Sequence, residues 1–140
     1  MTDLDVTDTE AAIELGPIAT GSYRRFQPDW GVGVGISVGR PRRPIPGVLG
    51  RCRVLEPHGI FPKFNDDRPE YERRYRLRVA NEWDAMIANL AEVRRANADV
   101  IGPLVLLCWD DLDEPDMWCH RELAAELLEH RLGITIPDLG

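Results

Sequence analysis

An uninterrupted apolar segment at residues 104–108, Leu-Val-Leu-Leu-Cys, is followed almost at once by an acidic segment at 110–116. Five consecutive apolar residues are typical of a strand that is covered on both faces, as in a parallel sheet. Residues 110–116 carry five carboxylates among seven residues, so this segment cannot remain in a core. The pattern predicts a buried strand that leads into an exposed acidic loop.

Leucines at helical spacing follow the acidic loop, with charged residues between them. They are Leu123, Leu127, Leu128 and Leu132. This spacing predicts an amphipathic helix. Asp116 is suited to be its N-cap and Gly133 to be its C-terminal stop. Cys119, His120 and Arg121 then lie in the first turn, at a strand-to-helix junction.

The Cys-His-Arg sequence at this junction has two interpretations. A helix N-terminus presents unpaired N–H groups and a partial positive charge, which attract phosphate or carboxylate. The same field favours the thiolate, so Cys119 is a candidate nucleophile, His120 a candidate acid or base that titrates near neutral pH, and Arg121 a candidate phosphate ligand. In the alternative, Cys119 is a buried small hydrophobe, and His120 and Arg121 bond loop carbonyls and lock the sheet.

Valines and an isoleucine alternate with small residues over 32–39, which predicts a strand with one face open to close packing. Prolines in the following segment exclude a helix, so Arg40, Arg42 and Arg43 lie on a stiff loop at the carboxyl end of this strand. Ligands of open α/β sheets bind at that end, so these arginines are candidate ligand-binding residues that clamp an anion. The glycines do not match a dinucleotide fingerprint, and no cofactor is predicted.

Charge is segregated along the chain. The net charge of −7 argues against a general nucleic-acid coat protein. Acidic residues crowd the N-terminus and the 109–116 region, whereas arginines cluster at 24–25, 40–43, 51–53 and 73–78. Arginine clusters suit phosphate recognition. Since Lys63 is the only lysine, arginine also serves simply as the surface cation; we prefer that explanation for 73–78 and keep both for 40–43.

The remaining elements are predicted from periodicity and punctuation. We expect a short strand at 51–55, one long helix from Asp67 to about Asn97, and an edge strand at 134–136. The helix carries a continuous apolar stripe made of Tyr75, Val79, Trp83, Met86, Ile87, Leu90 and Val93. Residues 1–16 form an acidic tail, flexible or in a short helix, and residues 17–140 form a single domain.

No apolar run approaches the roughly 18 residues that a spanning helix needs, so no membrane contact is predicted. The acidic N-terminus does not resemble a secretory signal, and we expect a cytoplasmic protein with reduced cysteines. Cys52 and His58 could join Cys119 and His120 around zinc, but the spacing matches no compact ligand pair, so no metal is predicted. Cys108 and Cys119 also lack the spacing of a redox pair.

The segment LLCWDDLDEPDMWCHRELAAELL at 106–128 resembles the C-terminal signature of domain-of-unknown-function family 488, in which an apolar strand ends in cysteine and Cys-His-Arg opens a helix. Shorter similarities lie in ISVGRPR at 36–42, LEPHGIFPKF at 55–64, YRLRV at 75–79 and TIPDLG at 135–140. The loop between the two cysteines is longer and more acidic than in compact members. The resemblance implies a small α/β fold with a Rossmann-like sheet and no established activity.

These observations predict one three-layer, Rossmann-like α/β domain with a small, mostly parallel sheet. Two functions remain open, and so does whether the protein is an enzyme. The first is a site for a nucleotide, a phosphosugar or nucleic acid, at the 119–121 turn with the arginines of 40–43. The second is a non-enzymatic interaction module whose acidic loop, 110–116, binds a protein partner.

Overall fold

The computed structural model describes residues 7–109 and 120–140. The helices and strands of these residues follow in the order α1 (Thr9–Leu15), β1 (Ile18–Ser22), the 3-10 helix η2 (Pro28–Trp30), β2 (Val32–Gly35), β3 (Val48–Arg51), α2 (Arg68–Asn81), α3 (Trp83–Ala96), β4 (Leu104–Cys108) and α4 (His120–Leu132). The predicted α/β class is confirmed.

The described strands form one sheet with the order β1-β4-β2-β3, and every pair is parallel. β4 lies inside the sheet, where Leu104 pairs with Ile18 on one side and with Val32 on the other. All five residues of β4 are buried, as the apolar run predicted. Because the strands are parallel, their carboxyl ends share one edge of the sheet, and that edge is where ligands of such sheets bind.

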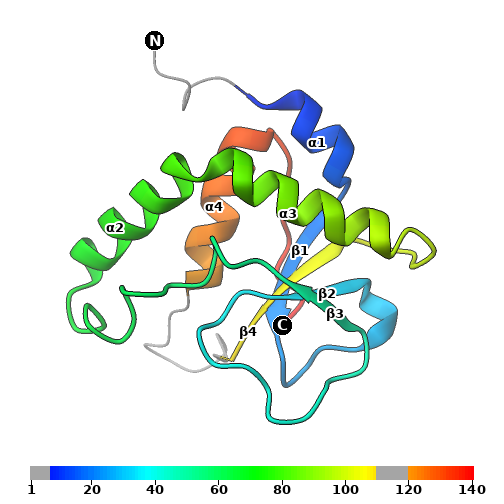
Figure 1. Cartoon of the computed structure of the whole chain (residues 1–140), viewed down its shortest axis with the longest axis horizontal. Coiled ribbons are helices and arrows are strands. Elements are labelled where there is room, and N and C mark those ends of the chain that lie inside the picture. Colours follow the sequence, from blue (N-terminus) through cyan, green and yellow to red (C-terminus); the bar gives the residue numbers. More distant parts are fainter. Residues whose placement is uncertain (1–6, 110–119) are drawn as a thin grey trace.

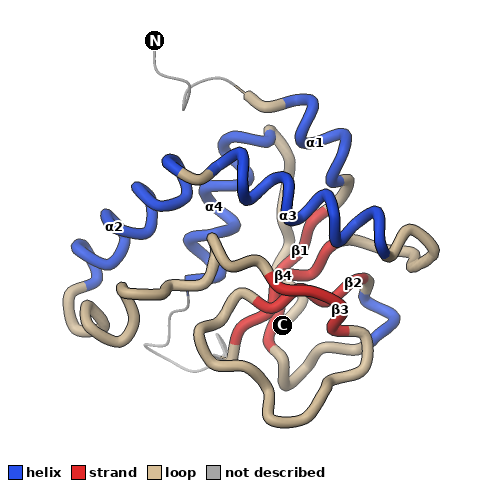
Figure 2. Tube along the Cα trace, in the orientation of Figure 1, coloured by secondary structure: helices blue, strands red, loops and turns tan. Residues whose placement is uncertain are grey.

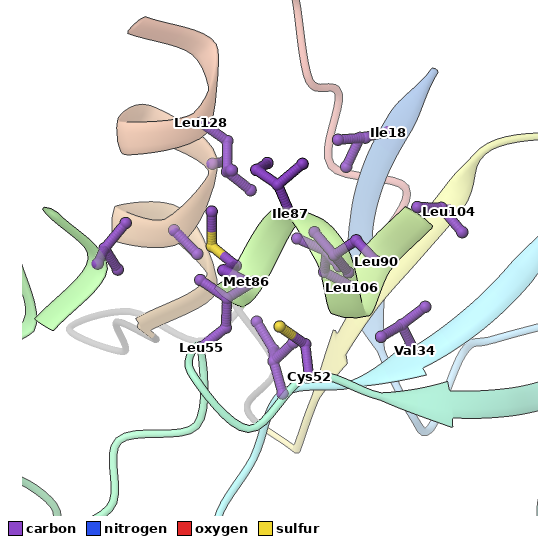
Figure 3. Packing of buried hydrophobic residues seen from close by; sticks show 14 of the residues in the cluster. Ile18, Val34, Cys52, Leu55, Met86, Ile87, Leu90, Leu104, Leu106 and Leu128 are labelled. Atoms are coloured by element: carbon purple, nitrogen blue, oxygen red, sulfur yellow. The ribbon is translucent and has the colours of Figure 1, made fainter. Parts of the chain in front are cut away.

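The two faces of the sheet are covered differently. α1, α3 and α4 lie over one face (Figures 1 and 2), where Met86, Leu90 and Leu128 point toward Leu104 and Leu106 (Figure 3). In the described part of the chain, loops and η2 cover the opposite face in place of α-helices. The smaller core on this face consists of Tyr23, Phe26, Val105 and Leu107 with Trp30, Ile45 and Val48. The third layer is therefore thin.

β2 has the close-packed face that its glycines predicted. A Cβ on Gly33 would lie 2.8 Å from the carbonyl oxygen of Gly47, and one on Gly35 would collide with the hydroxyl of Tyr23. These glycines allow the covering loops to approach the strand. As a result Tyr23 lies against the end of β2, at the carboxyl edge of the sheet.

Several predicted boundaries are wrong. The helix expected at 67–97 is interrupted at Glu82, although the buried stripe from Tyr75 to Leu90 runs through both α2 and α3. The strand predicted at 51–55 lies at 48–51, and the strand predicted at 32–39 ends at Gly35. No strand forms at 134–136. Instead Thr20 of β1, a strand that was not predicted, receives a bond from Leu139 N and donates to Pro137 O.

Of the two forms expected for residues 1–16, residues 9–15 adopt the short helix, and residues 1–6 lie outside the described part. The N-cap Asp8 accepts a bond from Ala11 N at 3.1 Å and another from Trp83 Nε1 at 2.8 Å. The bond from Trp83 is the main cause that lowers the pKa of Asp8. Ala11 and Leu15 are buried in the main core, so α1 belongs to the domain predicted at 17–140.

α4 ends at Leu132 and is followed by Gly133 at φ +67°, which confirms the predicted stop. The predicted N-cap Asp116 and the acidic loop at 110–116 lie outside the described residues. Within residues 7–109 and 120–140, no helix combines the length and the apolar composition that crossing a membrane requires.

Candidate anion-binding site

A cleft of about 410 Å³ opens at the carboxyl ends of β2 and β3. Arg40, Arg42 and Arg43 line it, as their position after a strand predicted, and all three are exposed. Within the described part of the chain they make no hydrogen bond or ion pair. Three guanidinium groups therefore border one hollow and are available to a ligand.

A fourth arginine at the cleft is held in place by a buried carboxylate. Glu56 is only 1% exposed, and its Oε1 accepts a bond from Arg51 Nε at 2.8 Å. Oε2 accepts from Arg51 Nη2 at 2.5 Å and lies 3.1 Å from His58 Nε2. The hydrogen bond to Glu56 raises the pKa of Arg51. This pair orients Arg51 before any ligand arrives, which reduces the entropy lost on binding.

The segment that carries Glu56 is anchored by α2. Arg78 Nη1 donates to the carbonyl oxygen of Glu56 at 2.8 Å, and its Nη2 donates to that of His58. The hydroxyl of Tyr75 donates to the carbonyl oxygen of Leu55 at 2.7 Å. Two side chains of one rigid helix therefore fix the loop that holds the carboxylate beneath the cleft.

The cleft is cationic although the chain is acidic. Within residues 7–109 and 120–140, four arginines and one glutamate line it, so four positive charges minus one negative charge leave +3. Tyr23, whose pKa is raised by burial, also lines the cleft and stays neutral, with its hydroxyl 3.4 Å from Ser37 Oγ. Guanidinium forks match the geometry of phosphate and carboxylate oxygens. This arrangement is suited to binding an anion.

His120 lies apart from the arginine cleft and is buried. Its Nε2 is 2.5 Å from the carbonyl oxygen of Ile36, and its ring packs edge-on against Tyr75. Burial lowers the pKa of His120 to about 4. The prediction that His120 titrates near neutral pH is therefore wrong, because the buried ring is neutral at pH 7 and donates a bond that ties α4 to the end of β2.

Arg121 is 1% exposed, and it lines neither the arginine cleft nor the cavity beside His120. Its Nη1 is 3.3 Å from Cys108 Sγ, and its Nη2 is 3.3 Å from Asp138 Oδ2. It thus connects the end of β4 to the C-terminal segment. The structure does not bring Arg121 together with Arg40, and this placement favours the structural alternative for the turn.

The cysteines differ from the sequence prediction. Cys119, the predicted nucleophile, lies outside the described residues. Cys108 is disulfide-bonded, so the prediction of reduced cysteines is wrong for this residue. Cys52 is a free, buried thiol whose pKa is raised to about 11 by burial, which makes it a poor nucleophile at neutral pH.

A second cavity of about 130 Å³ adjoins the same edge of the sheet. Phe61, Tyr71, Trp109 and His120 line it, and Ser37 lines both this cavity and the arginine cleft. In the described parts of the chain, no three His, Cys, Asp or Glu side chains group so as to hold a metal ion.

Sequence reasoning did not single out Arg51, Glu56 or Tyr23. Arg51 lies in an arginine cluster that the sequence shows, but its partner Glu56 is recognisable only from the fold. No protein-family model, curated protein or solved structure matches this chain. The resemblance to domain-of-unknown-function family 488 therefore stays a prediction that rests on short motifs.

Proposed function

We propose that this protein binds a phosphate-bearing ligand in the cleft between the arginine loop, residues 40–43, and Arg51. One observation carries the proposal: four arginines face a single carboxylate around a hollow of about 410 Å³, and three of the four have no partner in the described chain. Arginines without partners that converge on one cleft are typical of phosphate recognition.

The two kinds of arginine have different tasks in this proposal. Arg51 is oriented by Glu56 and sets the position of the anion. Arg40, Arg42 and Arg43 are exposed on the proline-rich loop and close over the remaining oxygens. Neither His120 nor Arg121 lines the arginine cleft, and both support the carboxyl edge of the sheet beside it. The proposal therefore moves the anion site from the 119–121 turn to the arginine loop.

The test compares two double variants of equal charge. Arg42→Gln with Arg43→Gln removes half of the cleft's arginines, and Arg73→Gln with Arg74→Gln removes two exposed arginines from α2. The probes are inorganic phosphate, ribose 5-phosphate, mononucleotides and short oligonucleotides, screened by thermal shift and then by calorimetry. A ligand at a hundred times its Kd adds about 2.7 kcal/mol of stability, which is readily detected.

We expect at least one phosphate-bearing probe to bind, the cleft variant to bind it at least tenfold more weakly, and the α2 variant to bind it as the unmodified protein does. Binding should also weaken as salt rises, because the exposed arginines are screened. If no probe binds, or if both variants lose affinity equally, the cleft is not an anion site.

A second candidate is a protein-interaction module without chemistry. It is favoured by the bonds of His120 to Ile36 and of Arg121 to Asp138, which give that turn a structural task. In this case the acidic segment 110–116 would bind a basic partner. Replacing its aspartates with asparagine should then abolish binding of a lysine-rich peptide, whereas unchanged binding would exclude that role for the segment.

A further inference from the structure

The second cavity differs from the arginine cleft in charge and in shape. Its aromatic lining includes Phe61 and Trp109, which are 45% and 40% exposed, together with the buried Tyr71. Among the described residues that line it, none is Asp, Glu, Lys or Arg. A cavity of about 130 Å³ is smaller than the roughly 300–1,000 Å³ of whole small-molecule sites, so it fits one ring system and not a complete ligand.

One hydrogen bond and one ring contact hold Trp109 at this cavity. Its indole N–H donates to the carbonyl oxygen of Gly39 at 2.9 Å, and its ring lies 4.6 Å from that of Tyr23. A partly exposed indole that is fixed in this way is a ready surface on which a flat ring can stack. Asn65 also lines the cavity, and its amide can bond the polar edge of such a ring.

The aromatic cavity and the arginine cleft share the short segment from Ser37 to Gly39. Ser37 lines both, and its hydroxyl donates to the carbonyl oxygen of Gly39 at 2.5 Å. The same oxygen accepts the bond from Trp109. Arg40 follows immediately and lines the cleft. One ligand that crosses this segment would place an uncharged ring on one side and an anion on the other.

We propose that the ligand is a nucleoside monophosphate, with its phosphate in the arginine cleft and its base in the cavity beside Trp109 and Phe61. This inference rests on the proposed function and adds the second half of the ligand. Inorganic phosphate and phosphosugars fill only the cationic half. The same chemistry occurs in a free mononucleotide and at the phosphorylated end of a nucleic acid, and the experiment separates these two sources.

The experiment measures Kd by calorimetry for AMP, ribose 5-phosphate, and an oligonucleotide with and without a terminal phosphate. The variants are Phe61→Leu and Trp109→Leu, which keep an apolar side chain but remove a flat ring. The control is Leu77→Ala, which alters an exposed apolar side chain on α2. Two separate ring variants keep the test valid if one of them does not fold.

We expect AMP to bind at least tenfold more tightly than ribose 5-phosphate. Each ring variant should weaken AMP binding about tenfold, the order expected for one lost stacking partner, and leave ribose 5-phosphate within twofold. The control should change neither. An oligonucleotide that binds more tightly than AMP only when it carries the terminal phosphate identifies the nucleic-acid end as the source; otherwise the free nucleotide is the ligand.

Equal affinities for AMP and ribose 5-phosphate would overturn the inference and leave the phosphate site standing. Ring variants that weaken both ligands equally would also overturn it. If no phosphate-bearing probe binds at all, the proposed function fails, and the inference fails with it.

Discussion

The arginine loop and the His120–Arg121 turn lie at the same edge of the sheet, and the sequence suggested one task for both. In the structure, Arg40, Arg42 and Arg43 are exposed and have no partner in the described chain, whereas Arg121 is 1% exposed and bonds Cys108 and Asp138. A buried guanidinium cannot leave its partners for a ligand without exposing uncompensated groups. Burial and existing partners, more than residue type, therefore decide which arginine can bind.

Removing the Arg121 side chain gives the strongest test of this contrast between exposed and buried arginines. Arg121→Ala should lower the free energy of unfolding by about 3–5 kcal/mol, because it empties a large buried site and breaks the bonds made by Nη1 and Nη2. Asp138 is 39% exposed, so water compensates part of the loss and the lower end of this range is expected. Urea unfolding measures the change.

The matched control is Arg76→Ala, which removes an exposed arginine paired with Glu126 at 3.2 Å. Exposed pairs of this kind contribute about 1 kcal/mol or less. If Arg121→Ala costs no more than this control and also weakens ligand binding, Arg121 belongs with the loop arginines, and the contrast between the two segments is wrong.

The pH dependence of stability tests the other residue of the turn. Burial depresses the pKa of His120 from 6.5 to about 4, so the folded state binds fewer protons than the unfolded state between these values. The stability that the folded state gains from a neutral His120 is fully present above pH 6.5 and is lost as the pH falls toward 4. The loss amounts to about 3 kcal/mol. The glutamine of His120→Gln does not titrate. Between pH 7 and 4 the stability of this variant should therefore fall by about 3 kcal/mol less than the stability of the unmodified protein.

Urea unfolding at a series of pH values measures the difference, and carboxylates that titrate in the same range cancel between the two proteins. His130→Gln, which makes the same substitution at an exposed histidine of the same helix, is the matched control. Identical slopes for His120→Gln and the unmodified protein would show that His120 is not buried in a neutral form.

The smallest effect is expected at the arginine loop. Arg42→Gln with Arg43→Gln should change the free energy of unfolding by no more than about 0.5 kcal/mol, because both side chains are exposed and have no partner in the described structure. A small stabilisation would also agree with this prediction, because the described residues of the cleft carry a net charge of +3 and the double variant reduces their repulsion. A loss above 1 kcal/mol without any loss of ligand binding would assign these arginines a structural task.

Sequence patterns predicted the parts of the fold that depend on residues close together in the chain. The apolar run became β4, Gly133 ended α4, and the stripe of α2 and α3 is buried as expected. β1 was missed because its sequence, Ile-Ala-Thr-Gly-Ser, has neither an apolar run nor an alternating pattern. Its five residues are buried because β4 and the C-terminal segment pair with it, and neither is near it in sequence.

The candidate site also has some features that the sequence determined and others that only the fold decided. The sequence by itself determined that Arg40, Arg42 and Arg43 follow a strand, because prolines and glycines control the backbone within a few residues of themselves. The tertiary structure alone decided that Arg51 is oriented by Glu56, that two cavities meet at Ser37, and that His120 bonds a carbonyl 84 residues away. Solvent exposure and the pKa depend on atoms brought together from the whole chain, so they follow from packing and cannot be read from neighbours in sequence.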